Sequence, residues 1–380
     1  MLHTVEFYIN INQREKQLME ELHGKRIKRV LREVENNYPE FRLRIGKPHL
    51  NKRHNIYLQI DAIELLKCED GIITEADYEQ VQERIVELEK ILFGHLHLKF
   101  ILNRIDYRLD VKVHSDEHRE CLFKMWGKLA SKYGHLTKRT KKKKFRKEGD
   151  RDIYIDCQQF KTTIYIASKA LVVCVYDKGA ERKAKNETIK TYEENVVRFE
   201  VRLMARHLAY KAREKKIKRT LKAYFRQDTF DYYIRKYVFG IFGTGHFNKI
   251  NKVREQLADN GVKTKDQQEL ICFLKDVTKR GIEGAISYRE NSKNQKGCSR
   301  YKFIKYKIIL DVLGINMIML PIREKVEGDV LMNPLYEVYL ESFERLILKM
   351  LCIQILLRQE YTEIVSYQLT TLTKNKFHKL

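Results

Sequence analysis

Charged and phenolic side chains alternate with apolar ones in three segments of the chain, at residues 104–114, 171–178 and 197–203. Alternate side chains of a β-strand share a face, so each segment predicts one apolar face and one polar face. The polar faces combine carboxylates, a phenol and a lysine, which are the groups that metal-assisted phosphoryl transfer needs. A solvated sheet face covered by cross-strand ion pairs is the alternative interpretation. In chain order the polar residues are Arg104, Asp106, Arg108, Asp110, Lys112, His114, Cys174, Tyr176, Lys178, Arg198, Glu200 and Arg202.

Strand geometry limits which carboxylates can share a metal ion. Asp106 and Asp110 are separated by about 13 Å in a strand that rises about 3.3 Å per residue, too far for one ion with oxygen ligands at roughly 2.1–2.5 Å. Asp106 and Glu200 can instead meet across neighbouring strands, where opposed positions approach to about 5 Å. We therefore predict Asp106 and Glu200 as ligands of Mg²⁺ or Mn²⁺, with Asp110 behind them.

Three sequence strings in this order and spacing resemble a known family: NRIDYRLDV at 103–111, VVCVYDKGAE at 172–181 and VVRFEVRL at 196–203. They resemble the gene II/X replication proteins of filamentous phages and the related replication-initiation factors of small plasmids and conjugative elements. The resemblance implies a rolling-circle replication initiator that nicks one strand of origin DNA, at a specific site, through a covalent 5′-phosphotyrosine. It implies that Tyr176 is the nucleophile, that Lys178 and Glu181 act with it, and that Asp106 and Glu200 surround a divalent cation.

The predicted chemistry requires an activated phenol. A phenol with a pKa of about 10 is a poor nucleophile at neutral pH, so we expect a cation and Lys178 to favour the phenolate. Attack on phosphorus would leave a phosphotyrosine ester and a free 3′-hydroxyl, while the metal polarises the phosphate. The string His95-Leu96-His97 offers an alternative metal contact, because a strand would place both imidazoles on one face.

Composition favours a polyanionic partner. The 380 residues include 75 Lys+Arg and 51 Asp+Glu, which gives a formal net charge of +24. Such a surplus is typical of proteins that bind nucleic acid or an anionic membrane surface. A hydrophobic content of 43% is enough to fill a core, so the chain is globular. The seven cysteines include no C-x-x-C pair, so neither a disulfide framework nor a zinc knuckle is indicated.

Basic segments predict how DNA is held. Residues 138–147 place eight basic side chains in ten positions, and we predict that this run clamps phosphates. The basic stretch 211–222 could lie along a duplex or simply face water. Four tyrosines nearby, Tyr224, Tyr232, Tyr233 and Tyr237, could stack on bases, although core packing suits most of them better. The predicted DNA-binding residues are Lys141, Lys142, Lys143, Lys144, Arg146, Arg198 and Arg202.

The elements that position these residues can be predicted from periodicity and caps. Short strands joined by tight connections favour an antiparallel sheet, and Thr74 and Gly94 bound a predicted helix. We predict an α+β fold in which an antiparallel sheet with flanking helices carries the active site, followed by a mostly helical C-terminal domain. The expected domains are a nicking domain at 1–250 and a helical accessory domain, possibly DNA-binding, at 251–380. Strands are expected at 55–63, 96–113, 153–159, 162–168, 170–178 and 195–203, and a helix at 115–134.

Location and partners follow from the same features. The chain has no uninterrupted apolar stretch of about 18 residues and no secretory signal layout, so we expect a cytoplasmic protein without membrane association. The expected partners are double- and single-stranded origin DNA, a host helicase and polymerase, and possibly a second copy of the chain. A relaxase that starts conjugative transfer by the same chemistry and a non-catalytic basic DNA-binding regulator are the alternatives.

Overall fold

The chain divides into two compact units in the computed structural model, which describes residues 1–46, 53–132, 156–282, 284–285, 300–324, 326 and 328–342. Unit 1 comprises Met1–His114 and His135–Ile241, and unit 2 comprises Ser115–Gly134 and Phe242–Leu380. The division therefore falls earlier than the predicted boundary at 250, and the predicted helix at 115–134 groups with the second unit. The mixture of helices with an antiparallel sheet confirms the predicted α+β class.

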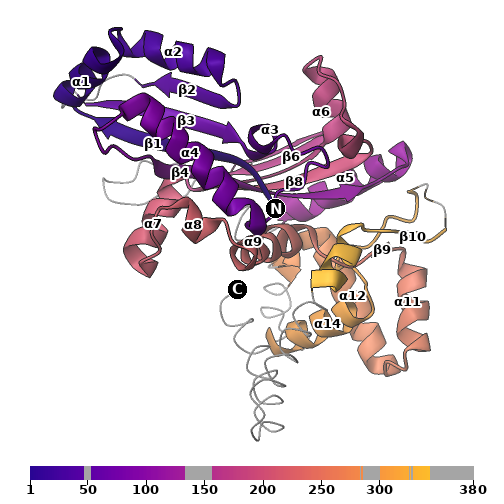
Figure 1. Ribbon diagram of the computed structural model, residues 1–380. Helices are drawn as coiled ribbons and strands as arrows, with labels where there is room; N and C mark the ends of the chain where they lie inside the picture. The colour runs from indigo at the N-terminus through magenta and orange to yellow at the C-terminus, as the bar shows by residue number, and fades with distance from the viewer. Residues whose placement is uncertain are drawn as a thin grey trace, which may run out of the picture. The chain divides into compact units, whose positions relative to one another are not determined.

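Unit 1 is built on an eight-stranded sheet with the order β2-β3-β1-β4-β8-β7-β6-β5 (Figure 1). Every neighbouring pair is antiparallel, as predicted. The first strand of the chain and the late strand β8 both pair with β4, which therefore lies in the middle of the sheet. The strands are β1 Leu2–Ile11, β2 Phe41–Ile45, β3 His54–Asp61, β4 Ile101–Lys112, β5 Asp156–Phe160, β6 Thr163–Ala167, β7 Leu171–Asp177 and β8 Val196–Leu203.

The helices of unit 1 include one pair that periodicity did not predict. These two helices, α1 Gln13–His23 and α2 Ile27–Asn37, precede the first predicted strand, in a region where no helix was expected. Helix α4, Tyr78–Phe93, follows the predicted Thr74 capping box and ends at Gly94. The remaining helical segments are α3 Ala62–Leu66, η1 Glu75–Asp77, α6 Lys178–Ala184, η2 Thr191–Glu193, α7 Ala205–Lys215, α8 Leu221–Tyr224, α9 Gln227–Ile234 and η3 Arg235–Phe239.

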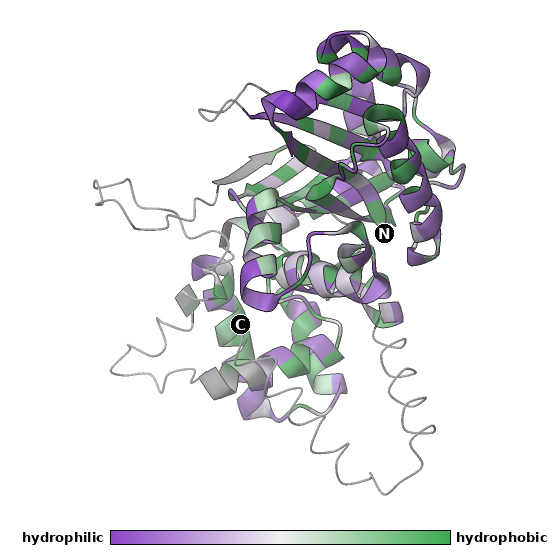
Figure 2. Cartoon of the chain, turned by 60° about the vertical axis from the view of Figure 1, so that its left-hand side comes forward, coloured by the Kyte–Doolittle hydropathy of each residue, from purple (hydrophilic) through white to green (hydrophobic). Residues whose placement is uncertain are grey.

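One face of the sheet is apolar and forms the core of unit 1. Hydropathy alternates along the strands (Figure 2), and the apolar side chains of this face include the fully buried Val5, Ile105 and Val201. Aromatic contacts attach helices to this face: the Phe100 ring lies 6.5 Å from Phe7 of β1 and 5.4 Å from Phe93 of α4. Helix α9 packs in the same way through Tyr233, which stacks on Tyr107 of β4 at 5.7 Å. Alternate side chains of a strand point to opposite faces, so the polar side chains lie on the face that these helices do not cover.

Unit 2 is mostly helical. Its core includes Trp126 of α5, whose ring contacts Phe123 at 5.8 Å and Phe242 at 6.5 Å. None of the helices in the described ranges is long and apolar enough to cross a membrane. The elements of unit 2 are α5 Asp116–Lys132, α10 Gly240–Phe242 at the division between the units, β9 Phe247–Asn248, α11 Ile250–Asp259, α12 Thr264–Arg280, α14 Arg300–Val312 and β10 Val330–Leu331.

Tyr107 provides a test of the core. It is fully buried, and its hydroxyl donates to the Tyr224 carbonyl at 2.6 Å. We expect Tyr107→Ala to lower the free energy of unfolding by about 3–5 kcal/mol, because the cavity refills only partly. Tyr107→Phe loses only the hydrogen bond, for about 1 kcal/mol. Urea unfolding measures both against Ile101→Ala, which is 41% exposed on the same strand and should change stability by less than about 0.5 kcal/mol. Equal losses for the two alanine variants would contradict this packing.

Candidate active site on the polar face of the sheet

The polar residues predicted from three separate strands share one face of the sheet. Cross-strand pairs have side chains on the same side, and β7 pairs with β8 so that Tyr176 opposes Arg198 and Cys174 opposes Glu200. On its other side β8 pairs with β4, where Glu200 opposes Arg108. The phenol and the two predicted metal-binding carboxylates therefore lie on a common surface.

The expected direct opposition of Asp106 and Glu200 is wrong. Asp106 opposes Arg202, and Glu200 opposes Arg108, so the two carboxylates stand on a diagonal. Diagonal neighbours are roughly 7–8 Å apart between Cα atoms, compared with about 5 Å for opposed ones. The register pairs every acid with an arginine rather than with the other acid.

Tyr176 is held by Glu200. Its hydroxyl donates to Glu200 Oε1 at 2.6 Å, and both residues are buried, at 9% and 1% exposure. Burial and the Glu200 charge raise the pKa of Tyr176 well above its ordinary value, while Arg198 acts in the opposite direction. The expected phenolate-favouring environment is therefore not present, because Tyr176 is a protonated donor to a buried carboxylate.

Glu200 is the centre of the hydrogen-bond network. Two nitrogens of Arg202 donate to Oε2, at 2.6 and 3.0 Å, and His3 Nδ1 lies 3.2 Å from Oε1. Burial would raise the pKa of Glu200, but His3, Arg202 and the Tyr176 hydrogen bond together hold it well below its ordinary value. Glu200 is therefore a charged acceptor in the resting protein.

His3 is the residue of this network that sequence patterns missed. The register of β1 against β4 shifts between Leu2 and Thr4, which is a β-bulge. A bulge changes where a side chain points, and here it accompanies contacts of His3 with Glu200 and, at 3.6 Å from Nε2, with Asp61 of β3. No alternation pattern could reveal this contact, because a bulge breaks the alternation.

Asp106 has a separate partner on its own strand. The Arg104 guanidinium donates to both carboxylate oxygens, and Arg202 Nε lies 3.8 Å from Oδ2. Asp106 is 1% exposed, and this burial raises the pKa of its carboxyl in spite of Arg104. Asp110, expected behind the metal, instead accepts two hydrogen bonds from Arg198 at 2.8 and 2.9 Å.

Lys178 and Glu181 form a second ionic cluster at the start of α6. The Lys178 ammonium lies 2.6 Å from Glu181 and 3.5 Å from Glu193, while Arg182 donates to Glu193 at 2.8 Å. The amine therefore contacts carboxylates, and the cation opposite Tyr176 is Arg198. Arg182 and Lys178 overcome the burial of Glu193 and lower the pKa of its carboxyl to about 2.

The remaining predicted residues are placed as follows. His95 and His97 lie exposed in the turn before β4, so the expected strand face that would hold both imidazoles does not form. Arg198 is buried and occupied by Asp110, whereas the Arg202 side chain is 28% exposed. The residues of the basic run, Lys141, Lys142, Lys143, Lys144 and Arg146, lie outside the described residues.

The carboxylates do not present a ready site for a divalent cation. Guanidinium, imidazole and phenol groups engage the oxygens of Asp106 and Glu200. In the described parts of the chain, no group of three or more His, Cys, Asp or Glu side chains is arranged to hold a metal ion. A cation at this position would have to displace Arg104 or Arg202.

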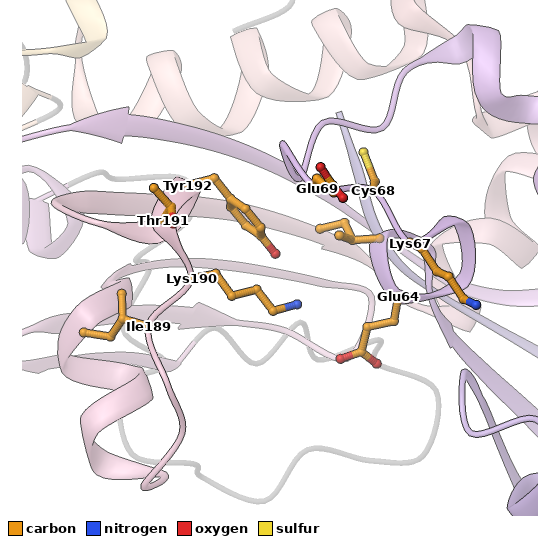
Figure 3. A pocket seen from close by; sticks show the side chains of 9 residues that line it. Glu64, Lys67, Cys68, Glu69, Ile189, Lys190, Thr191 and Tyr192 are labelled. Atoms are coloured by element: carbon orange, nitrogen blue, oxygen red, sulfur yellow. The ribbon is translucent and has the colours of Figure 1, made fainter.

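An open pocket lies beside the ionic network, lined by α3 with the residues that follow it and by η2 with the residues that precede it. The Arg108 guanidinium donates to the Gly71 carbonyl, and Gly71 packs against the Tyr192 ring. The cavity has a volume of about 600 Å³, and Figure 3 shows the side chains that line it. Its mixture of apolar, aromatic and oppositely charged groups does not single out one ligand class. The lining residues are Ile63, Glu64, Lys67, Cys68, Glu69, Ile189, Lys190, Thr191 and Tyr192.

Comparison with known proteins adds no relative. A scan against protein-family models finds no match for this chain, and a search of curated proteins finds none with significant similarity.

Two glycines with similar backbone angles test the loop contact. Gly71 has φ +67, and a Cβ there would meet the Tyr192 ring at 2.6 Å; Gly24 has φ +63 with nothing within 4 Å. Both alanine variants carry the left-handed backbone cost of about 1–2 kcal/mol. Because only Gly71→Ala must also displace Tyr192, we expect it to lose about 1–3 kcal/mol more. Urea unfolding measures the difference, and equal losses would contradict the contact.

Proposed function

We propose that unit 1 is a tyrosine nickase that starts rolling-circle DNA replication by cleaving one strand of an origin. The observation that carries the proposal is the 2.6 Å hydrogen bond from the Tyr176 hydroxyl to Glu200, on a face that also carries Arg104 and Arg202. A nucleophile within hydrogen-bond distance of a base that a third group orients is the general arrangement of an activated nucleophile. Here Arg202 and His3 are the groups that orient Glu200.

In the proposed reaction Tyr176 attacks a backbone phosphorus. The bond from Tyr176 Oη to phosphorus forms, the bond from phosphorus to the 3′ oxygen breaks, and the phenol proton passes to Glu200. The 3′ oxygen leaves as a hydroxyl after taking a proton from water, and the 5′ phosphate stays on Tyr176. Side chains of Arg202 and Arg104, which are 28% and 21% exposed, would stabilise the charge that develops on the phosphoryl oxygens.

Substrate binding supplies the missing activation in this proposal. Arg202 donates to Glu200 in the resting protein. A phosphate that drew Arg202 away would leave the buried Glu200 charge with one stabilising partner fewer, and burial then raises its pKa and its basicity. The phenol would thus be activated only when DNA occupies the site.

The proposal extends to the surroundings of the reaction. It includes a requirement for Mg²⁺ or Mn²⁺, for which Asp106 and Glu200 would have to release Arg104 and Arg202. It also includes a cytoplasmic location, origin DNA, a host helicase and polymerase as partners, and a possible homodimer. Conjugative relaxase activity would use the same residues.

A non-catalytic DNA-binding regulator is the second candidate. It is favoured by the burial of Tyr176, which is only 9% exposed and has its pKa raised. Strand cleavage separates the two candidates, because a regulator would bind DNA and leave it intact.

Replacing the nucleophile is the decisive test. We expect Tyr176→Phe to reduce nicking of a supercoiled plasmid that carries the DNA flanking the coding sequence, by roughly a thousandfold or more. Tyr165→Phe is the matched control: Tyr165 opposes Cys174 on the same face, and its variant should nick within about twofold of the parent. Reactions with Mg²⁺, Mn²⁺ or EDTA, followed by gel separation of open circles and of covalent protein–DNA adducts, give the readout. Unchanged nicking by Tyr176→Phe would refute the assignment.

Glu200 is tested by an isosteric change. We expect Glu200→Gln to lower the nicking rate by roughly 10²- to 10⁴-fold, since the amide cannot accept the phenol proton, while DNA binding persists. Glu6→Gln is the control, because Glu6 is also a buried carboxylate, 7% exposed and paired with Arg44. Its variant should retain nicking. Single-turnover cleavage and filter binding measure the two properties, and equal rates for both variants would remove Glu200 from the mechanism.

A further inference from the structure

A basic and aromatic surface lies on the face of the sheet opposite the one that carries Tyr176. Helix α9 packs on the apolar face, where Tyr233 stacks on Tyr107, and the next residue toward its N-terminus, Tyr232, is 48% exposed. The polar face that carries Tyr176 points the other way, because Tyr107 belongs to the apolar parity of β4. This surface therefore takes no part in the proposed chemistry.

Tyr232 is flanked by two lysines from different elements. The ammonium groups of Lys211 on α7 and Lys236 on η3 each lie 5.6 Å from the centre of its ring. The two ammonium groups are thus at most about 11 Å apart and concentrate positive charge at one exposed ring. An anion at this position would be attracted to both ammonium groups.

Aromatic neighbours hold the Tyr232 ring in place. Tyr232 meets Tyr233 edge to face at 5.1 Å, and Tyr233 stacks on Tyr237 at 6.1 Å. The Tyr233 hydroxyl is hydrogen-bonded to His207 Nε2 of α7 at 2.7 Å, which joins the two helices. Because its neighbours fix it, the exposed ring loses little freedom when a ligand stacks on it.

The charge around the ring selects an anionic ligand. Residues 205–222 hold eight basic side chains and one acidic one, and α7 also exposes Tyr210 at 47%. A cation–π pair at an exposed site contributes only about 0.5–1 kcal/mol, so the two lysines do not by themselves account for an aromatic residue that is 48% exposed. A half-exposed tyrosine with the ammonium groups of two lysines over its ring matches the combination of stacking and phosphate contacts by which proteins hold single-stranded nucleic acid.

We propose that Tyr232, Lys211 and Lys236 form a second binding site for single-stranded DNA, in which a base stacks on Tyr232 and the lysines contact the flanking phosphates. An unpaired strand is required because the bases of a duplex do not offer their faces. The choice of DNA over RNA rests on the proposed function; the stacking site itself does not. In that setting the site would hold a strand displaced from the duplex, away from the cleavage centre.

The experiment uses the full chain and a fluorescein-labelled twelve-nucleotide deoxythymidine oligomer, with anisotropy as the readout. We expect Tyr232→Ala to weaken binding by roughly five- to a hundredfold, the range for loss of one stacked base. Tyr232→Phe keeps the ring and should bind within about twofold of the parent. Binding of a duplex of the same length should be unchanged in both variants.

Salt dependence separates the lysines from the ring. Each lysine that contacts a phosphate of a single strand contributes about 0.7 to the slope of log affinity against log salt. Lys211→Gln and Lys236→Gln should each lower the slope by about that amount, whereas Tyr232→Ala should leave it unchanged. Lys222→Gln, a change of an exposed lysine on α8, is the control with an unchanged slope.

Cross-linking locates the contact. An oligomer containing 5-iododeoxyuridine should cross-link on irradiation to a peptide that contains Tyr232, as identified by mass spectrometry. The site is overturned if Tyr232→Ala binds the oligomer as the parent does, or if Tyr232 carries no cross-link. Tyr176→Phe is included in the oligomer-binding assay to distinguish this proposal from the proposed nicking function. It should bind the oligomer as the parent does, because loss of nicking does not affect stacking on Tyr232.

Discussion

Mutual neutralisation of charges across β4 and β8 is the constraint on which the rest of unit 1 depends. The two strands place four arginines and three carboxylates on one face: Arg104, Asp106, Arg108, Asp110, Arg198, Glu200 and Arg202. An ion buried without its partner costs several kcal/mol. A register slip of one residue would move these groups into the apolar core. The hydrogen-bonded pair of Arg198 with Asp110, which joins β8 to β4, therefore favours the register that aligns the aromatic core on one side and Tyr176 with Glu200 on the other.

This neutralisation also decides what the face offers a ligand. A metal ion can bind these carboxylates only by replacing the arginines that already neutralise them. A phosphate, in turn, can bind the arginines only by replacing the carboxylates. Arg198 is 1% exposed and fixed by Asp110, so it supports the sheet, whereas the Arg202 side chain is partly exposed and free to exchange. The two arginines occupy the same strand and parity, yet burial gives them different capacities.

Periodicity in the sequence predicted much of the fold. Alternation located β4, β7 and β8, because it is a local signal. Local caps also marked Thr74 at the start of η1, which leads into α4, and Gly94 at the end of α4. The pair α1 and α2 was missed, although α1 begins with a capping box at Asn12 and ends at Gly24. Those caps were the available signal. The grouping of α5 with unit 2 depends on contacts with residues far along the chain, such as Trp126 with Phe242, which no local pattern contains.

The site was predicted less completely than the fold. Parity brought Tyr176 and Glu200 to one face, but it does not determine the register between strands, and so the diagonal relation of Asp106 to Glu200 was not foreseen. Exposure was also misjudged: a polar face is expected to be solvated, whereas Asp106, Arg198 and Glu200 are each only 1% exposed. His3 reaches Glu200 through a bulge, which is a departure from the alternation on which the prediction relied.

The position of β4 between the first strand and the last strand of the sheet has a consequence for biosynthesis. Asp110 and its partner Arg198 are 88 residues apart in sequence, so a nascent chain can pair β4 with β1 well before β8 leaves the ribosome. During that interval one edge of β4 is open and Asp110 lacks its β8 partner Arg198, a state that invites association with other chains. When β8 emerges, it pairs with the open edge of β4 and brings Arg198 and Arg202 to that face in one step. Translation of β8 therefore ends the interval in which this edge of β4 is exposed to other chains.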